Sequence, residues 1–381
     1  MSMRQARQLW VQVHLWLGLA LGLPFVLLGL TGSLLVFYNE LDRSLNPDIQ
    51  VVQAASAPPS IQAVAQKLQQ AYPQRSGAWR VELPLTPSTP LAARYYQPEE
   101  KAGRFFAPLI LTLEPSTLQI TSQRFWGDYL MTWLFDLHYT LLLEGSGRQW
   151  VGWIGLFMSV SLACGVYLWW PNSRRWWQAL KLQLRPGVVR ATYDVHALTG
   201  VYTGVLLLVL CLTGVALAWP QTTQAVLGTQ QLMQRRVAAS GAAPARAPLD
   251  LDAGLALARQ QFPQAELRWV ELPARGHTVL SVRLHQAQEP GRRFPKTQVW
   301  VDLAAAQVVA VNNPLEQSTG SQIQAWLHPL HNGEAFGLGG RLLACVCGVV
   351  PLVLLISGTL RWRQKARARA AVRRGRFSSV S

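Results

Sequence analysis

The sequence is poor in charged residues, above all in acidic ones. Asp, Glu, Lys and Arg make up only 14% of its 381 residues, against about a quarter in a typical soluble domain, whereas 50% of the residues are hydrophobic. This composition argues against a soluble globular enzyme. It also excludes a disordered chain, because so many apolar side chains have to be buried somewhere.

Cysteine is scarce as well. The four cysteines, Cys164, Cys211, Cys345 and Cys347, all lie in long apolar runs, so no disulfide framework supports the rest of the chain. The sequence also lacks a C-x-x-C-H motif, which excludes covalent attachment of a c-type haem.

Four stretches carry no charged residue and are long enough to cross a bilayer, whose hydrocarbon core of about 30 Å needs ~20 helical residues. The first is too long for the apolar core of a cleaved signal peptide, and no A-x-A motif precedes its exit. We therefore expect four transmembrane helices. The charge-free stretches are residues 9–39, 149–173, 195–234 (apolar only to about 219) and 342–360.

The basic residues are distributed unevenly around these stretches. The two chain ends and the loop 174–194 contain 15 basic residues and one acidic residue, Asp194, whereas the two long segments 40–148 and 220–341 contain 20 basic and 18 acidic residues. The positive-inside rule then predicts cytoplasmic termini and two large external segments. The net charge of +16 therefore indicates topology and contact with anionic lipid. It does not indicate nucleic-acid binding, because no aromatic residues are interleaved in the tail beyond Trp362 and Phe377.

The two external segments match each other with an offset of about 190 residues. In each, a helical pattern leads to an aromatic-Pro-Gln turn, a Trp and a Glu-Leu-Pro motif, over residues 61–84 and 251–273. A strand-like run at 109–113 corresponds to one at 299–303. We expect each segment to form an amphipathic helix packed on antiparallel strands.

The match continues into the membrane stretches and includes four histidines. The first and third stretches share the pattern His-x3-Gly-x3-Gly followed by Thr-Gly. The second and fourth are each preceded by Trp-Leu-x-x-Leu-His and by a Gly-Arg pair nine and ten residues after that histidine. A histidine repeated at each of four membrane boundaries is a stronger signal than any single histidine. The matched motifs are His14-x3-Gly18-x3-Gly22 with Thr31-Gly32, His196-x3-Gly200-x3-Gly204 with Thr213-Gly214, Trp133 to His138 with Gly147-Arg148, and Trp326 to His331 with Gly340-Arg341.

These histidines are candidate ligands for a cofactor. An ionisable residue at membrane depth is costly and indicates function. His14 and His196 lie near the predicted cytoplasmic face, and His138 and His331 lie near the external face. Two facing imidazoles on antiparallel neighbouring helices can supply both axial nitrogens of a haem iron. We therefore predict two non-covalent haems with bis-histidine ligation, one near each face.

Other residues of the repeat are expected to complete the two sites. Glycines four and eight residues after a histidine lie on nearly the same helix face, so that a porphyrin ring can lie flat against them. Arginines at the water boundary can pair with haem propionates. The candidates are Gly18, Gly22, Gly200, Gly204, Arg148 and Arg341.

Each of these features also has a simpler interpretation. Gly-x3-Gly is a close helix-packing motif in membranes, an interfacial histidine can cap a helix or face headgroups, and an interfacial arginine can be a topology anchor. A zinc site would need four converging ligands, and each histidine pair offers two. His328, three residues before His331, is a reserve ligand, whereas His277 and His285 are expected on the surface.

The motifs together make the chain similar to a known family. They are His14-Leu-Trp-Leu-Gly18, Asp136-Leu-His138 with Gly147-Arg148, His196-x3-Gly200-x3-Gly204, and Leu330-His331-Asn-Gly333 with Gly340-Arg341. With them the chain resembles, over essentially its whole length, the PepSY-associated transmembrane family of the bacterial inner membrane, and within it the FoxB type, the siderophore reductases.

The resemblance implies an α-helical membrane protein with four transmembrane helices plus two α+β periplasmic PepSY-like domains. The expected organisation, with both termini cytoplasmic, follows from it and from the charge pattern. It comprises the N-terminus and first helix (1–39), a first periplasmic domain with an interfacial helix carrying His138 (40–148), a second helix (149–173), a cytoplasmic loop (174–194), a third helix (195–219), a second periplasmic domain carrying His331 (220–341), a fourth helix (342–360) and a basic tail (361–381).

The resemblance also implies bound b-type haem and reduction of ferric iron in siderophores. Electrons would come from a donor in the cytoplasm or from the quinol pool and pass through both haems to a periplasmic ferric siderophore. No residue is singled out for substrate contact, although external arginines such as Arg124 and Arg292 are candidates. The alternatives are a non-enzymatic scaffold that binds a partner in iron transport, a siderophore permease, or a protein that delivers or stores haem.

Overall fold

The computed structural model describes residues 2–49, 51, 59–84, 86, 89–171, 176–181, 187–229 and 250–378, with side chains up to residue 372. Parts of the expected loop 174–194 and of the tail 361–381 thus lie outside the described residues. The chain divides into two compact units. The membrane unit comprises residues 1–36, 137–219 and 330–381, and the sheet unit comprises residues 37–136 and 220–329.

The membrane unit contains the four expected apolar helices, each long enough to cross a bilayer. The helices begin five to seven residues before the charge-free stretches, because their first turns include charged and polar residues that suit the water boundary. Short α6 (Trp176–Ala179) lies between the second and third. The long helices are α1 (Met3–Val36), α5 (Glu144–Trp169), α7 (Val188–Ala218) and α12 (Gly337–Ser378).

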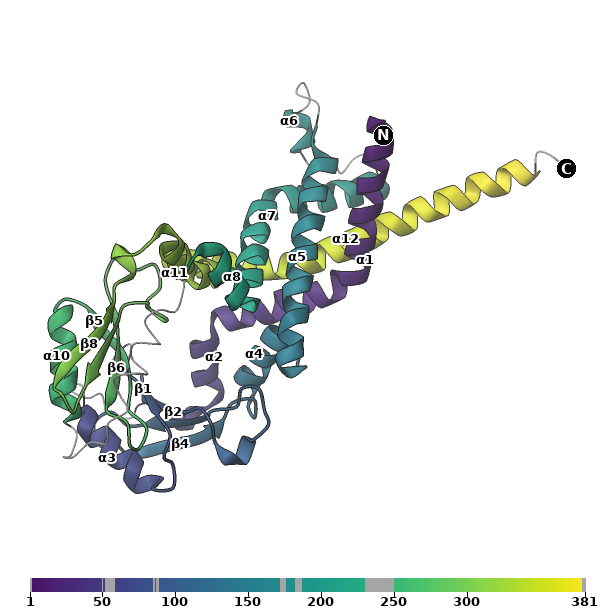
Figure 1. Ribbon diagram of the computed structural model, residues 1–381. Helices are drawn as coiled ribbons and strands as arrows, with labels where there is room; N and C mark the ends of the chain where they lie inside the picture. The colour runs from purple at the N-terminus through teal and green to yellow at the C-terminus, as the bar shows by residue number, and fades with distance from the viewer. Residues whose placement is uncertain are drawn as a thin grey trace. The chain divides into compact units, whose positions relative to one another are not determined.

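The four long helices form a closed ring in which α1 and α7 each contact both α5 and α12 (Figure 1). Small residues allow the close approach of α1 and α12. A Cβ atom at Gly348 would overlap the carbonyl oxygen of Gly29, and Ser33 Oγ donates to the carbonyl of Cys345 at 2.7 Å. On the opposite side of the ring, a Cβ at Gly155 would lie 2.9 Å from Val215. Backbone contact through small residues is a common way to pack helices in lipid.

The sheet unit contains both long segments. The first supplies α2 (Tyr38–Leu45), a 3₁₀ turn (Pro47–Ile49), α3 (Ile61–Ala71), β1 (Trp79–Glu82), β2 (Leu91–Tyr95), a 3₁₀ turn (Glu99–Lys101), β3 (Leu109–Leu113), β4 (Ile120–Phe125) and α4 (Leu130–Thr140), the last of which ends in the membrane unit. The second supplies α8 (Pro220–Leu227), α10 (Leu251–Gln261), β5 (Glu266–Glu271), β6 (Val279–His285), β7 (Gln298–Asp302), β8 (Gln307–Asn312), a 3₁₀ turn (Pro314–Glu316) and α11 (Thr319–His331), whose last two residues belong to the membrane unit, followed there by a 3₁₀ turn (Glu334–Phe336).

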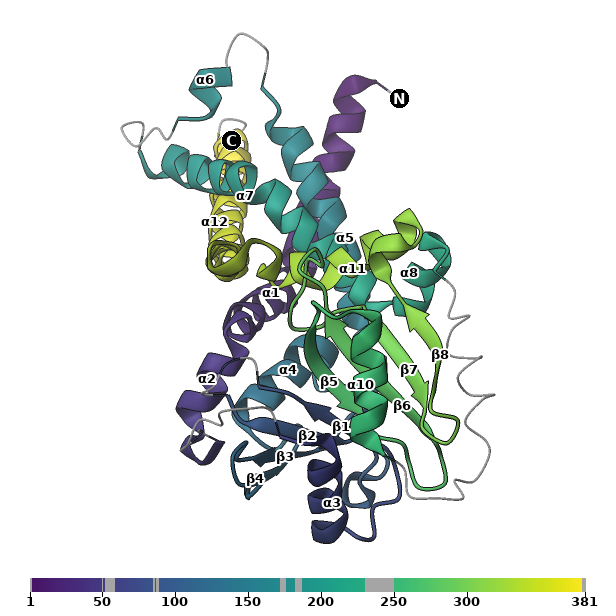
Figure 2. The same cartoon turned by 90° about the vertical axis from the view of Figure 1, so that its left-hand side faces the viewer.

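All eight strands form one antiparallel sheet in the order β4-β3-β2-β1-β5-β6-β7-β8 (Figure 2). The two segments meet where β1 pairs with β5, with Val81 opposite Val270. The sequence led us to expect two separate small domains at 40–148 and 220–341, whereas the structure has one compact unit with a continuous sheet. Pairing β1 with β5 satisfies two strand edges that separate domains would leave open.

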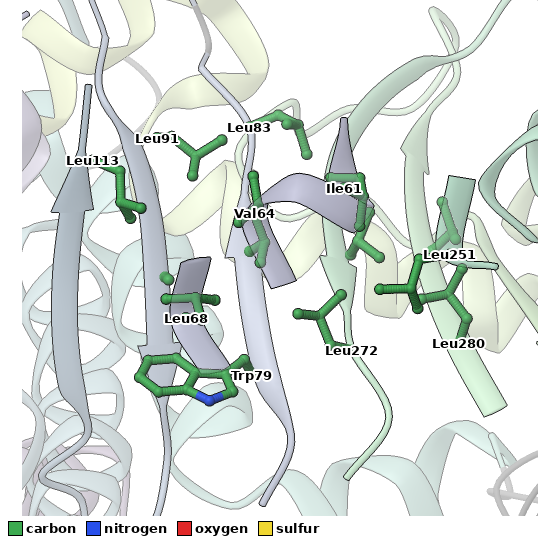
Figure 3. Close-up of a cluster of buried hydrophobic side chains, with 14 of the residues drawn as sticks. Ile61, Val64, Leu68, Trp79, Leu83, Leu91, Leu113, Leu251, Leu272 and Leu280 are labelled. Carbon is green, nitrogen blue, oxygen red and sulfur yellow. The ribbon is translucent and has the colours of Figure 1, made fainter. Parts of the chain in front are cut away.

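One face of this sheet packs against α3 and α10. Alternate strand residues such as Val81, Leu111 and Val270 are fully buried there, together with Ile61 and Leu68 from α3 (Figure 3). These large apolar residues form a single core that includes side chains from both halves.

Polar caps begin the two packed helices and bring them together. Ser60 Oγ accepts from the amide of Ala63 at 3.1 Å, and Asp250 accepts from Ala253 at 2.8 Å. Asp252 of α10 also accepts from the amide of Ile61 at 2.8 Å, so one helix caps the other. Such carboxylate caps near helix N-termini are stabilising.

The Gly348 crossing predicts a clear effect on stability. Gly348→Leu should destabilise the membrane unit by about 1–3 kcal/mol, because backbone cannot move aside as a flexible side chain can. Gly339→Leu on the same helix is the matched control, since nothing lies within 4 Å of a Cβ there. Thermal unfolding of both variants in detergent measures the difference, and equal melting temperatures would contradict the tight crossing.

Candidate functional site

The four repeated histidines form two pairs inside the membrane unit. His14 of α1 and His196 of α7 have ring centroids 6.0 Å apart with an interplanar angle of 74°. His138, at the end of α4, and His331, the last residue of α11, have centroids 6.1 Å apart with an angle of 49°. The structure therefore brings together the pairs that the sequence repeat predicts.

Each histidine uses its Nδ1 atom to bond the neighbouring helix. Nδ1 lies 2.9 Å from the Ser161 carbonyl oxygen for His14, and 3.0 Å from the Leu28 carbonyl for His138. A carbonyl oxygen can only accept, so Nδ1 must carry the proton and the neutral ring has its lone pair on Nε2. The same bond joins His331 to the Leu210 carbonyl at 3.1 Å. His196 Nδ1 lies 3.1 Å from Ser357 Oγ of α12, and its ring also interacts with the backbone of Leu354, one turn earlier.

Hydroxyl groups reinforce these bonds. Thr31 Oγ1 and Thr213 Oγ1 lie 3.1 Å from the Nδ1 atoms of His138 and His331, and each hydroxyl donates its own proton to its own helix at 2.7 Å. The hydroxyl oxygens are therefore acceptors for Nδ1–H as well. Ser357 Oγ donates to the Val353 carbonyl at 2.6 Å, so it accepts from His196 Nδ1 in the same way. Ser161 Oγ lies 3.2 Å from His14 Nδ1.

A glycine lies against each imidazole. Cβ atoms built at these four glycines would lie 3.0–3.2 Å from the Cε1 atom of the ring, which is tighter than ordinary van der Waals contact. Each glycine directly follows a Thr, Ser or Cys, and that residue comes three positions after the residue whose backbone interacts with the imidazole. The four pairs are Gly32 with His138, Gly165 with His14, Gly214 with His331 and Gly358 with His196.

Sequence reasoning noted Thr31-Gly32 and Thr213-Gly214 as matching motifs but gave them no role, and it missed Cys164-Gly165 and Ser357-Gly358. The second and fourth helices repeat with an offset of 193 residues, which aligns Cys164 with Ser357 and Gly165 with Gly358. This alignment was the available signal. It shows that Cys164 occupies the place that Thr or Ser takes in the other three helices.

The two pairs lie at different levels of the bundle. Eighteen residues of α1 separate His14 from Gly32, which is about 27 Å along a helix at 1.5 Å per residue. The same interval separates His196 from Gly214 on α7. This spacing is close to the roughly 30 Å hydrocarbon thickness of a bilayer, so each pair lies near one end of the apolar region.

A family comparison gives these observations a context. The model of the PepSY-associated TM region matches residues 11–365, which include all four histidines and the eight strands. The chain belongs to this family. It is a multi-pass membrane protein of a family associated with haem-linked electron transfer in membranes. Among the curated proteins, none matches the chain.

Of the glycines predicted to form a flat cradle in this PepSY-associated protein, three have room beside them. A Cβ at Gly18 would meet nothing within 4 Å, and those at Gly200 and Gly204 would make only ordinary contacts at 3.8 and 3.7 Å. Gly22 differs, because a Cβ there would lie 2.6 Å from Leu355 of α12. The face of Gly22 therefore packs against α12.

The predicted arginines already have protein partners. Arg148 donates to the hydroxyl of Tyr139 at 3.1 Å, and Arg341 donates to the carbonyl of Val36 at 2.9 Å.

The remaining histidines lie outside the pairs. His328, the reserve ligand, has its ring edge against Phe294 in the sheet unit, with centroids 4.7 Å apart. His277 is exposed, as expected, and His285 Nε2 lies 3.4 Å from the Glu289 carbonyl.

The donor set fits a bis-histidine haem. Imidazole–metal bonds are about 2 Å long, so two Nε2 atoms sharing one metal place their ring centroids roughly 6 Å apart, as both pairs do. Within the described residues, no third His, Cys, Asp or Glu joins either pair. The sites therefore offer two neutral nitrogens each, which suits the axial positions of a porphyrin iron better than tetrahedral zinc.

The glycine contacts predict a measurable loss. Gly358→Leu should push the His196 ring from its position, because a side chain would enter the space of Cε1, and should remove the haem that this pair is expected to hold. Pyridine haemochrome analysis measures the content, with Gly339→Leu as the control on the same helix. A Gly358 variant that keeps the full content and an unchanged axial-ligand spectrum would disprove this positioning role.

Proposed function

We propose that this protein transfers electrons across the bacterial inner membrane through two b-type haems and reduces a ferric siderophore in the periplasm. The observation that carries the proposal is the pair of opposed imidazoles at each end of the bundle, each with Nδ1 bonded and Nε2 available. Distribution of the basic residues supports cytoplasmic termini, which place the His138–His331 pair on the periplasmic side.

When bound, each haem would supply a one-electron redox centre. The chain's own residues determine how it is held. His14 and His196 would hold one haem and His138 and His331 the other, through the free Nε2 atom of each ring, and two imidazole ligands per iron would leave no open position for oxygen. Such closed coordination suits electron transfer.

The surrounding bonds orient these ligands. A hydrogen bond from Nδ1–H to a carbonyl fixes the ring tautomer and its orientation, and it raises the basicity of Nε2. Because the accepting carbonyls belong to neighbouring transmembrane helices, the rings are held by the packed bundle and not by a mobile loop. Ligands held in this way would move little when the iron changes its charge, which favours electron transfer.

The substrate assignment follows from iron chemistry and from the family resemblance. Siderophores bind Fe(III) through hard oxygen ligands, and reduction by one electron gives Fe(II), a softer ion of lower charge that these ligands hold less well. The electron would come from a donor in the cytoplasm or from the quinol pool. Iron released on the periplasmic side would then be free for uptake.

The decisive experiment is quantification of haem per polypeptide together with a reduced-minus-oxidised spectrum of the purified full chain. We expect two haems per chain and the spectrum of low-spin, six-coordinate iron. Protein purified from haem-sufficient cells that shows no haem bands would instead indicate a scaffold whose histidines are structural.

Substitution of single histidines predicts site-specific losses. His138→Ala or His331→Ala should reduce the content from two haems to one and abolish reduction of an external ferric siderophore. His14→Ala or His196→Ala should also remove one haem but leave the outer site bound and cut off from internal donors. His277→Ala, at an exposed histidine outside both pairs, is the matched control. If all four variants kept two haems, the ligand assignment would be wrong.

The direction of transfer can be tested in vesicles. With a membrane-impermeant reductant inside and a ferric siderophore with an Fe(II) indicator outside, Fe(II) should appear outside only in vesicles that contain the intact chain oriented with its termini inside. Chains lacking His14 should show none. Accumulation of siderophore across the membrane without any reductant would favour a permease.

A further inference from the structure

The sheet unit contains a cavity on the sheet face that does not pack against α3 and α10. It has a volume of about 130 Å³ and is partly open to solvent. Its floor is formed by strand residues such as Ala92, Arg94 and Thr112, which alternate along β2 and β3 with the core residues Ala93 and Leu111. Its walls come from α2, from β5 and from the segment after β6.

The cavity wall is strongly basic. Five guanidinium groups and two carboxylates line it. Asp42 accepts from both terminal nitrogens of Arg124 at 3.2 Å, and Glu82 Oε1 lies 2.9 Å from Arg94 Nε. Arg268 also pairs with Glu266, at 3.3 Å, and the five guanidinium groups still outnumber these three acids. The five arginines are Arg43, Arg94, Arg124, Arg268 and Arg293.

The charge state of Glu82 reports the local potential. Burial alone would raise the pKa of this carboxyl, yet its pKa is lowered, because Arg94, Arg80, Arg293 and Arg268 outweigh the desolvation. Four guanidinium groups thus act on a single carboxylate. A potential of this sign attracts anions into a partly enclosed site.

Flat aromatic surfaces lie beside these charges. Tyr38, Trp269 and Phe294 line the cavity. The Arg293 guanidinium lies 5.2 Å from the Tyr38 ring centroid and 5.4 Å from that of Phe294. The Arg80 guanidinium lies 3.7 Å from the Trp269 ring centroid, so guanidinium planes already stack on these rings. A ligand that entered here would meet aromatic carbon and guanidinium planes together, and both favour a planar molecule.

Two buried donors on this wall have no acceptor within the described part of the chain. They are Arg124 Nε and Trp269 Nε1. Buried N–H groups without a partner are uncommon in folded proteins. Both atoms are covered by neighbouring protein atoms, so an acceptor in the cavity would reach them only after a side-chain movement. Both belong to residues that line the cavity, on β4 and β5 respectively.

We propose that this cavity binds a single aromatic oxyanion ring with adjacent oxygen atoms, of the catecholate or dihydroxybenzoate class. The surplus of guanidinium groups would hold the oxygens, and the aromatic walls would hold the ring. A closed protein cavity of about 150 Å³ accommodates one benzene ring. This cavity has about 130 Å³ but is partly open, so it can take one ring whose substituents extend toward its open side. A complete ferric siderophore is far larger, so the cavity would take one chelating arm of it.

This inference deepens the proposed function by naming the chemical class of the siderophore, and to that extent rests on it. Binding of a free ring requires neither haem nor iron, however. The two ideas can therefore fail separately: a chain without haem could still bind the ring, and a haem-containing reductase could still fail to bind it.

The test is isothermal titration calorimetry of the full chain in detergent with 2,3-dihydroxybenzoate. We expect saturable binding at one site per chain, with an affinity that falls as salt is added, because charge drives it. Arg293→Gln should weaken binding about tenfold, as expected for the loss of a hydrogen bond to a charged group. Arg292→Gln is the matched control, because this exposed neighbour does not line the cavity and pairs with Glu266 at 2.8 Å.

A second variant tests the cavity without changing its charge. Ala92→Leu extends from the floor into the space and should abolish binding, while haem content and the melting temperature stay unchanged. Citrate and acetohydroxamate distinguish other ligand classes. Binding of either one more tightly than the aromatic ring, equal affinities of the Arg292 and Arg293 variants, or undiminished binding by the Ala92 variant would each overturn the proposal.

Discussion

The hydrogen bond from each histidine Nδ1 to a carbonyl of an adjacent helix is the interaction on which the membrane unit depends. Three features of the adjacent helix make this bond possible. They are a backbone carbonyl that accepts from the ring, a Thr, Ser or Cys three residues after that carbonyl, and a glycine next to it that lets the ring approach. The same three elements occur around all four histidines. They turn a polar side chain that is costly in lipid into a ligand with one defined free nitrogen.

The glycines of the membrane helices have different structural roles. Gly29 and Gly348 bring α1 and α12 into backbone contact, Gly32 and Gly358 make room for imidazoles, and Gly18 leaves open space beside a histidine. Sequence spacing alone assigns all such residues to one motif. Only the neighbouring helix decides which purpose a given glycine serves.

Much of the architecture could be predicted from the sequence, because charge-free runs and period-2 or period-3.6 patterns are local signals. The helix at Ile61–Ala71 and the strand at Leu109–Leu113 agree with the expected positions, and the repeat predicted the two histidine pairs. The pairing of β1 with β5 could not be predicted, since strand neighbours distant in sequence leave no local trace. The cavity was also missed: of the two external arginines considered, Arg124 lines it, whereas Arg292 pairs with Glu266.

The continuous sheet makes the two halves of the chain interdependent. A fragment that ended after α5 would present the whole length of β1 as a bare edge, and it would lack Leu280, Val282 and the other apolar side chains that complete the shared core. It would also carry one imidazole of each pair. Such a half-molecule would satisfy its bare β1 edge only by pairing with another strand, as a second copy of itself would supply.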